Sequence, residues 1–187
     1  MDQQKIQYHI RELLLEIGED PDRPGLKDTP SRVAKMYAEV FRGYTDPAPV
    51  VTSFDDDKPR GLIMDKGYFF SMCAHHVLPF FGFYYWGYIP SPDGRYVGAS
   101  KIGRTVDYFA ARLQTQERLV TNILDYIESA VNPLGSILLM SGRHLCKEMR
   151  GLKKWDSPFE VIEARGILLE NKDGCKDEFI ARLGSRI

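Results

Sequence analysis

The sequence predicts an α+β fold built on a largely antiparallel sheet. Two helical segments open the chain, aromatic-rich segments of strand length come in two pairs, and a helical stretch separates the pairs. This order differs from the regular alternation of strands and helices that builds parallel sheets. We therefore expect an antiparallel sheet of about four strands, with two helices between the strand pairs.

The chain is expected to open with an N-terminal helical region, residues 1–58. Apolar residues recur at helical spacing in residues 6–17, and a loop rich in Pro, Asp and Gly follows. Thr29 followed by Pro30 is typical of the first turn of a second helix. Residues 59–187 are expected to form the α+β domain, in one functional unit with the helical region.

The strands and helices of residues 59–187 follow from local composition. The strand segments are GLIMDKGYFFSM (61–72), LPFFGFYYWGYIP (78–90), SILLMSGRHLC (136–146) and FEVIEARGILLE (159–170). Helical periodicity runs from residue 102 to residue 131, and Asn132-Pro133 ends it. The run SPDGR predicts a chain reversal before the helices.

Composition and charge exclude several classes of protein. Of the 187 residues, 43% are hydrophobic and 27% charged, as in soluble globular proteins. A formal net charge of −1 gives no overall basic field that would attract nucleic acid or an anionic membrane. The first residues hold no long apolar run, so we expect neither a signal peptide nor a membrane span. Three cysteines without framework spacing favour a reducing, cytoplasmic setting.

Two short runs of Cys and His could form one metal site. Cys73 and His76 make a C-x-x-H pattern, which alone is weak because buried Cys is usually inert core. His144-Leu145-Cys146 strengthens it, since alternate residues of a strand point to the same face. Cys73, His76 and Cys146 would give zinc three ligands and leave its fourth position open, as catalytic sites require.

The two remaining histidines of these runs, His75 and His144, would lie beside such a zinc. Adjacent residues rarely face the same ion, so with His76 as the ligand, His75 is expected to point away from the zinc. Zinc lowers the pKa of a bound water to about 7, and imidazole exchanges protons in the same pH range. The combination indicates hydrolytic attack on an electrophilic carbon.

Five ordered segments resemble the motif series of the GTP cyclohydrolase I family. They are GLKDTPSRVAKMY, CAHHVLPFFG, GASKIGR, RLQTQERL and HLCKEMRG, and the resemblance runs from about residue 6 to the C-terminus. It implies the tunnelling fold, with residues 59–187 as its catalytic domain, and a toroidal homodecamer with active sites between subunits. The implied reaction hydrolyses GTP at C8, releases formate and forms 7,8-dihydroneopterin triphosphate.

The resemblance also implies roles for individual residues. Cys73, His76 and Cys146 match the zinc ligands, and His75 and His144 match the catalytic histidines. Further positions match substrate-binding residues: Glu117 for the guanine edge with Gln116 beside it, and, for the triphosphate, Arg32, Lys35, Lys101, Arg104 and Arg150 with Ser100 beside them. A carboxylate suits guanine because it accepts from both N1–H and the exocyclic amine, which adenine cannot offer.

The chain departs from the family pattern beside these residues. Ala74 stands where the family usually has Glu, and SPFEVIEA (157–164) replaces a segment of the K-T-V-T-S-A type. One hypothesis is that Glu160 or Glu163 restores a carboxylate near the site. Cys175 is expected to be an exposed loop thiol without a role.

Three functions remain open from the sequence. The first is a zinc-dependent GTP cyclohydrolase I that supplies pterin, folate or deazapurine synthesis. The second is a divergent paralogue acting on another purine nucleotide, which Ala74 and residues 157–164 motivate. The third is a non-catalytic, zinc-containing nucleotide-binding oligomer, against which the presence of His75 and His144 counts.

Overall fold

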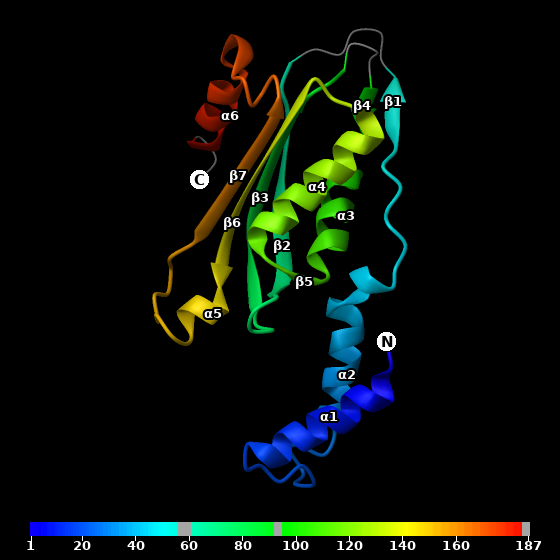
Figure 1. Ribbon diagram of the computed structural model, residues 1–187. Coiled ribbons are helices and arrows are strands. Elements are labelled where there is room, and N and C mark those ends of the chain that lie inside the picture. The colour runs from blue at the N-terminus through cyan, green and yellow to red at the C-terminus, as the bar shows by residue number, and fades with distance from the viewer. Residues whose placement is uncertain (56–60, 92–94, 185–187) are drawn as a thin grey trace. The chain divides into compact units, whose positions relative to one another are not determined.

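The computed structural model describes residues 1–55, 61–91 and 95–184 (Figure 1). Two compact units emerge, residues 1–47 and residues 48–187. The boundary predicted between residues 58 and 59 lies outside the described residues, as does most of the predicted SPDGR turn. No helix in the described part of the chain is both long enough and apolar enough to cross a membrane.

The first unit consists of α1 (Gln3–Glu16), α2 (Thr29–Val40) and the short η1 (Arg42–Tyr44). The side chain of Asp2 caps α1 by accepting a hydrogen bond from the Lys5 N–H at 3.1 Å. Pro30 lies in the first turn of α2, where its missing N–H costs nothing. Both predicted N-terminal helices are therefore present, and they pack against each other within this unit.

The second unit contains a five-stranded sheet in the order β5-β2-β3-β6-β7. Four strands form an antiparallel series: β2 (Ile63–Cys73), β3 (Pro79–Ile89), β6 (Gly135–His144) and β7 (Phe159–Gly166). The short β5 (Leu113–Gln114) lies at the other side of β2 and runs parallel to it. A separate two-stranded ribbon pairs β1 (Ser53–Asp55) with β4 (Arg95–Val97). Between the strand pairs lie α3 (Ala99–Ala110) and α4 (Gln116–Val131). The predicted α+β class and tunnelling-fold arrangement are confirmed.

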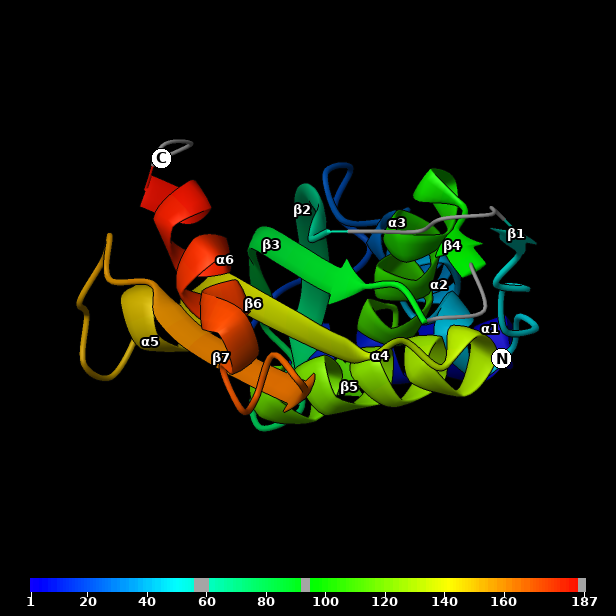
Figure 2. The same cartoon turned by 90° about the horizontal axis from the view of Figure 1, so that it is seen from above.

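Alternation along the strands gives the sheet two different faces. Trp86 and Tyr88 of β3 are buried in the core beneath α3 and α4. Tyr85, between Tyr84 and Trp86 in the strand, points to the other face. There it belongs to a second core with Phe179 of α6 (Cys175–Gly184). Helix α6 therefore covers part of the opposite face of the sheet (Figure 2).

The strand predicted through Cys146 ends earlier, at His144. Residues Leu145–Glu148 form the single-turn helix α5. The buried carboxylate of Glu148 accepts two hydrogen bonds from Arg143, at 3.0 and 2.6 Å, and this contact folds the chain back on the strand end. The expectation that residues 144 and 146 share one strand face is therefore wrong.

The C-terminal region is helical, and Cys175 is not an exposed loop thiol as predicted. Cys175 is the first residue of α6 and is buried, with its thiol donating to the carbonyl of Ile167 at 3.3 Å. It shares one helix face with Phe179 and Leu183, which are also buried. The charged residues around these three positions conceal the apolar stripe in the sequence.

Candidate metal centre and active-site cavity

The metal-ligand group begins at the end of β2. Cys73 is the last residue of that strand, and a tight loop follows it before β3. The Cys73 N–H donates to the Leu78 carbonyl at 2.8 Å, and Val77, at φ 53°, donates its N–H to the Cys73 carbonyl at 2.9 Å. This turn brings Nδ1 of His76 to 3.9 Å from the sulfur of Cys73.

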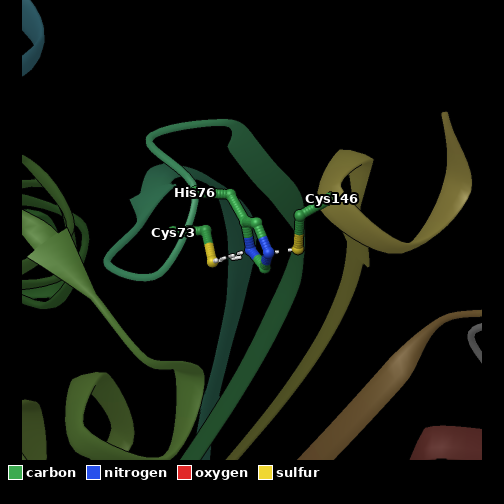
Figure 3. Close-up of side chains that lie close together, drawn as sticks. All are labelled: Cys73, His76 and Cys146. Carbon is green, nitrogen blue, oxygen red and sulfur yellow. Dashed lines mark hydrogen bonds between the residues drawn. The ribbon is translucent and has the colours of Figure 1, made fainter. Parts of the chain in front are cut away.

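The third member of the group comes from α5. Helix α5 places the sulfur of Cys146 at 3.8 Å from the sulfur of Cys73, and all three donor atoms lie within 4.8 Å of one another (Figure 3). Two thiolates bound to one tetrahedral zinc ion lie about 3.8 Å apart. Cys73, His76 and Cys146 could therefore hold a metal ion, although the sequence argument for Cys146 assumed the wrong local structure.

The surroundings of the group differ from side to side. Cys73 is buried, Cys146 half-buried and His76 exposed, so the group opens to solvent on the histidine side. Burial, and then the neighbouring Cys73 thiol, raises the pKa of Cys146. A bound cation would oppose this shift, because metal ligation requires the thiolate. Nε2 of His76 lies 3.0 Å from Nη1 of Arg150, which contacts this open side.

A cavity of about 230 Å³ adjoins the metal-ligand group. The predicted site residues that line it are Cys73, His75, His76, Gln116, Glu117, His144 and Cys146. They come from the end of β2 and the loop after it, from the start of α4, and from the end of β6 with α5. The fold thus gathers both predicted histidines, the metal-ligand group and the predicted guanine-binding carboxylate around one space.

His144 is held on several sides. Its ring stacks on Phe80, with centroids 4.5 Å apart and planes at 11°, and meets Phe159 edge-on at 5.8 Å. Burial is the main cause that lowers the pKa of His144, so the neutral imidazole is favoured. Nε2 of His144 lies 2.9 Å from Oε1 of Gln116.

The side chain of Gln116 is enclosed by the protein and is 1% exposed. Its amide nitrogen donates to the carbonyls of Met140 and Phe159, both at 2.8 Å. Neither amide hydrogen is left for a ligand. Its oxygen lies within hydrogen-bond distance of His144, and Gln116 also lines the cavity, so its place beside the substrate stays a prediction.

Glu117 occupies the first turn of α4. The stretch of helical periodicity, residues 102–131, forms two helices as predicted, with a break at residues 111–115. Thr115 caps the second helix by accepting from the Arg118 N–H at 3.3 Å. The exposed Glu117 lines the cavity at this helix start, where the helix dipole stabilises a negative charge. The break in the helix is what places a carboxylate at the cavity.

Comparison with known proteins decides the family. The family model described as GTP cyclohydrolase I matches residues 6–183. The chain belongs to the GTP cyclohydrolase I family. GTP cyclohydrolase 1 of Caldanaerobacter subterraneus subsp. tengcongensis is 43% identical over 188 residues, which cover 100% of this chain and 99% of that protein. GTP cyclohydrolase 1 of Mycobacterium tuberculosis strain H37Rv is 45% identical over 91% of this chain and 85% of its own.

A third relative agrees with these two. GTP cyclohydrolase 1 of Mycobacterium marinum is 48% identical over 167 residues, 88% of this chain and 83% of that protein. The protein is thus an enzyme of the hydrolase class and of the GTP cyclohydrolase I type.

Part of the predicted triphosphate set lies outside the cavity of this GTP cyclohydrolase I chain. Ser100, Lys101 and Arg104 lie in the first two turns of α3. Just before this helix, the Val97 N–H donates to the Tyr88 hydroxyl, beside the start of β2. At its other end the Ala110 carbonyl accepts from Ser71, next to the metal-ligand group. A 12-residue helix is about 18 Å long, so α3 separates its basic start from the cavity.

Arg32 and Lys35 belong to the first unit. Both are exposed on α2, and Arg32 forms an ion pair with Asp28 at 3.3 Å. Ion pairs this exposed contribute little to stability, so the guanidinium is not committed to that partner. Their role in triphosphate binding stays a prediction.

The structure shows where Ala74 and the glutamates of residues 157–164, which depart from the family pattern, lie relative to the cavity. Ala74 is exposed, and its N–H donates to the Gln114 carbonyl at 2.9 Å. Glu163 bonds Thr121 at 2.7 Å and Arg165 at 2.7 Å, so its carboxylate is committed beside α4. Glu160 follows Phe159, which lines the cavity, and therefore points to the opposite face of β7. The hypothesis that Glu160 or Glu163 restores a carboxylate at the site is wrong.

Four cavity residues had no place in the sequence reasoning: Gln114, Thr115, Lys147 and Phe159. Gln114 and Thr115 precede the predicted Gln116–Glu117 pair, and this adjacency was a usable signal. Lys147 donates to both the carbonyl and the hydroxyl of Ser157, at 2.8 Å, and thereby ties α5 to the segment before β7. No sequence pattern indicates that contact.

Proposed function

We propose that this chain is a zinc-dependent enzyme that hydrolyses GTP at C8, releases formate and forms 7,8-dihydroneopterin triphosphate. One observation carries the proposal: the group Cys73, His76 and Cys146 shares a single cavity with Glu117 and His144. A purely structural zinc site would need neither the carboxylate nor the extra histidine.

The donor set fits zinc. Two thiols and one imidazole within 4.8 Å, open to solvent on one side, match a three-ligand site with a free fourth position. When bound there, zinc supplies Lewis-acid activation of water near neutral pH. Cys73, His76 and Cys146 would hold it, and the remaining residues bind and orient the nucleotide.

Glu117 is proposed to recognise guanine. Its carboxylate at the cavity can accept hydrogen bonds from N1–H and from the exocyclic amine of the base. Adenine has no N1–H and presents an acceptor there, so it would leave the carboxylate unsatisfied. This interaction selects GTP over ATP and holds the purine with its imidazole ring directed at the metal-ligand group.

His144 and His75 are proposed to exchange protons with N7 of the purine and with the ribose oxygen. His144 is half-buried, and this partial burial favours the neutral imidazole, which can accept a proton and return it. His75 lines the same cavity and is exposed, so it can exchange protons with solvent. Each histidine thus has a suitable environment for proton transfer.

The triphosphate is proposed to bind Lys101, Arg104 and Arg150, with Ser100 beside them and Arg32 and Lys35 as further cations. The basic start of α3 lies outside the cavity of its own chain, so we assign it to the cavity of a neighbouring copy. The protein would then be a homo-oligomer, a decamer by family resemblance, with shared active sites in the cytoplasm.

An exposed aromatic face supports oligomer formation. Tyr68, Phe70 and Phe83, on the sheet face that α6 covers only in part, are 66%, 72% and 40% exposed. Tyr68 and Phe83 pair across the strands with ring centroids 4.5 Å apart. Contiguous exposed aromatic surface of this kind marks protein interfaces.

One assay tests the proposed function. The purified protein is incubated with GTP and, in parallel, with ATP, while formate and pterin absorbance are followed with and without a chelator. Metal-dependent pterin formation from GTP alone is the expected result. Turnover of only another purine nucleotide would overturn the substrate assignment, and stoichiometric zinc without any turnover would overturn the catalytic one.

A further inference from the structure

The amide of Gln116 has a fixed orientation. Its nitrogen faces two backbone carbonyls, of Met140 and Phe159, at 2.8 Å each. Carbonyls only accept hydrogen bonds, so the NH₂ end must point toward them and both of its hydrogens are used. The Oε1 end therefore faces His144, and an amide oxygen only accepts.

This orientation determines which nitrogen of His144 carries the proton. Because Oε1 of Gln116 accepts at 2.9 Å, Nε2 of His144 must donate. In a neutral imidazole the other nitrogen, Nδ1, then holds the lone pair. Nδ1 makes no hydrogen bond to the part of the chain that the structure describes, and His144 lines the cavity.

The surrounding packing maintains this geometry. The His144 ring lies between Phe80, stacked at 11°, and Phe159, edge-on at 88°. Gly142 leaves room for the amide, because a Cβ there would lie 2.5 Å from Oε1 of Gln116. With the ring and the amide both confined, their hydrogen bond is pre-organised before any substrate enters.

We propose that Gln116 is a positioning residue that holds His144 in its Nε2–H tautomer and so leaves Nδ1 as the nitrogen that exchanges a proton with the substrate. The catalytic consequence rests on the proposed function, whereas the tautomer assignment rests on the hydrogen bonds alone. Gln116 would thus influence proton transfer through His144, and not by donating a hydrogen bond to the nucleotide, because both of its amide hydrogens are used.

The test uses zinc-loaded protein labelled with ¹⁵N-histidine. The chain has four histidines, so the His144 nitrogens can be assigned by comparison with a His144→Gln variant. Above the pKa of His144 we expect a protonated Nε2 and an unprotonated Nδ1. In Gln116→Met, which removes the amide at similar size, we expect a mixture of tautomers, a fall in kcat of at least about tenfold and little change in KM for GTP.

Gln114→Met is the matched control. Gln114 is also buried, at 3% exposure, but its amide nitrogen donates to Phe109 and makes no bond to His144. This variant should keep the wild-type His144 tautomer. If Gln116→Met does not fold, Gly142→Ala tests the same contact, because the added methyl displaces the amide without removing a polar group.

Two results would overturn the inference. One is a wild-type His144 protonated on Nδ1, and the other is a folded Gln116→Met that keeps both the Nε2–H tautomer and the wild-type kcat. If the wild type does not turn over GTP at all, the proposed function fails, yet the nitrogen shifts still decide the tautomer.

Discussion

The functional residues beside the two ends of α3 differ in how far contacts within one chain hold them in place. Beside the C-terminal end, the three donor atoms of the metal-ligand group lie within 4.8 Å, and His144 is fixed by a buried amide and two rings. At the N-terminal end, Ser100 and Arg104 are exposed and lie outside the cavity. One end is built by intrachain contacts, and the other is left open.

Under the proposed function, this difference indicates what a second copy of the chain would contribute to each site. Side chains that must hold a metal or a proton at a defined atom are positioned by their own fold, because small displacements there are costly. Cations that bind a flexible triphosphate tolerate exposure and can come from a neighbour. The proposed oligomer would therefore complete substrate binding, whereas one chain alone supplies all three donor atoms of the metal-ligand group.

Removing a metal ligand should have the largest effect. We expect Cys146→Ala to lose bound zinc and all measurable GTP turnover, because two ligands do not retain the ion against dilution. Zinc measured by mass spectrometry after dialysis checks this. Cys175→Ala is the matched control, since this buried thiol lies in the α6 core and should leave zinc content unchanged. Full zinc retention in Cys146→Ala would remove Cys146 from the site.

Replacing His144 should lower the rate of GTP turnover without affecting zinc binding. His144→Ala is expected to retain zinc and to lose about 10²- to 10⁴-fold in kcat, the usual contribution of a general acid–base. Steady-state kinetics and zinc content, measured on the same sample, check both expectations. His9→Ala, on the exposed face of α1, serves as the control. Loss of zinc in His144→Ala would contradict the role assigned to it.

Changing the basic start of α3 should affect substrate affinity and leave the metal alone. Lys101→Ala is expected to raise KM for GTP about tenfold, as for one lost hydrogen bond to a charged group, with zinc content and kcat little changed. Lys172→Ala, at an exposed lysine outside the proposed site, is the matched control and should leave KM unchanged. An unchanged KM for GTP in Lys101→Ala would place the triphosphate elsewhere and would weaken the contrast between the two ends.

The smallest effect is expected at Ala74, where the family usually has Glu. Ala74 is exposed and is not among the cavity residues, and its ordered contact is through the backbone. We expect Ala74→Glu to keep zinc and to change kcat/KM by about twofold at most, as exposed substitutions do. A much larger gain would show that the missing carboxylate limits this enzyme.

Much of the fold was readable from the sequence because its signals are local. Richness in aromatic residues predicted β2 and β3, and Thr29-Pro30 predicted the start of α2. Helix α6 was missed because only Cys175, Phe179 and Leu183 face the sheet, among charged neighbours. Three sheet-facing apolar positions in ten residues form too weak a pattern to compete with the turn residues before them.

The site was predictable as a set of residues but not as a geometry. The runs around Cys73 and Cys146 identified the metal-ligand group, although α5 replaced the expected strand. The role of Gln116 could not be foreseen, because it bonds the backbone carbonyls of Met140 and Phe159, on two neighbouring strands far from Gln116 in the sequence. Backbone carbonyls carry no sequence signal, so contacts to them appear only in the folded chain.

Mixed oligomers test most directly whether each active site combines two chains. His144→Ala and the double variant Lys101→Ala/Arg104→Ala are co-expressed with different tags, and oligomers that carry both tags are purified. If a site takes its metal end from one copy and its basic end from another, random assembly leaves about a quarter of the sites unaltered. We predict that kcat/KM for GTP rises to about that fraction of the wild-type value, well above either variant alone. Mixed oligomers no more active than the average of the two variants would contradict the account.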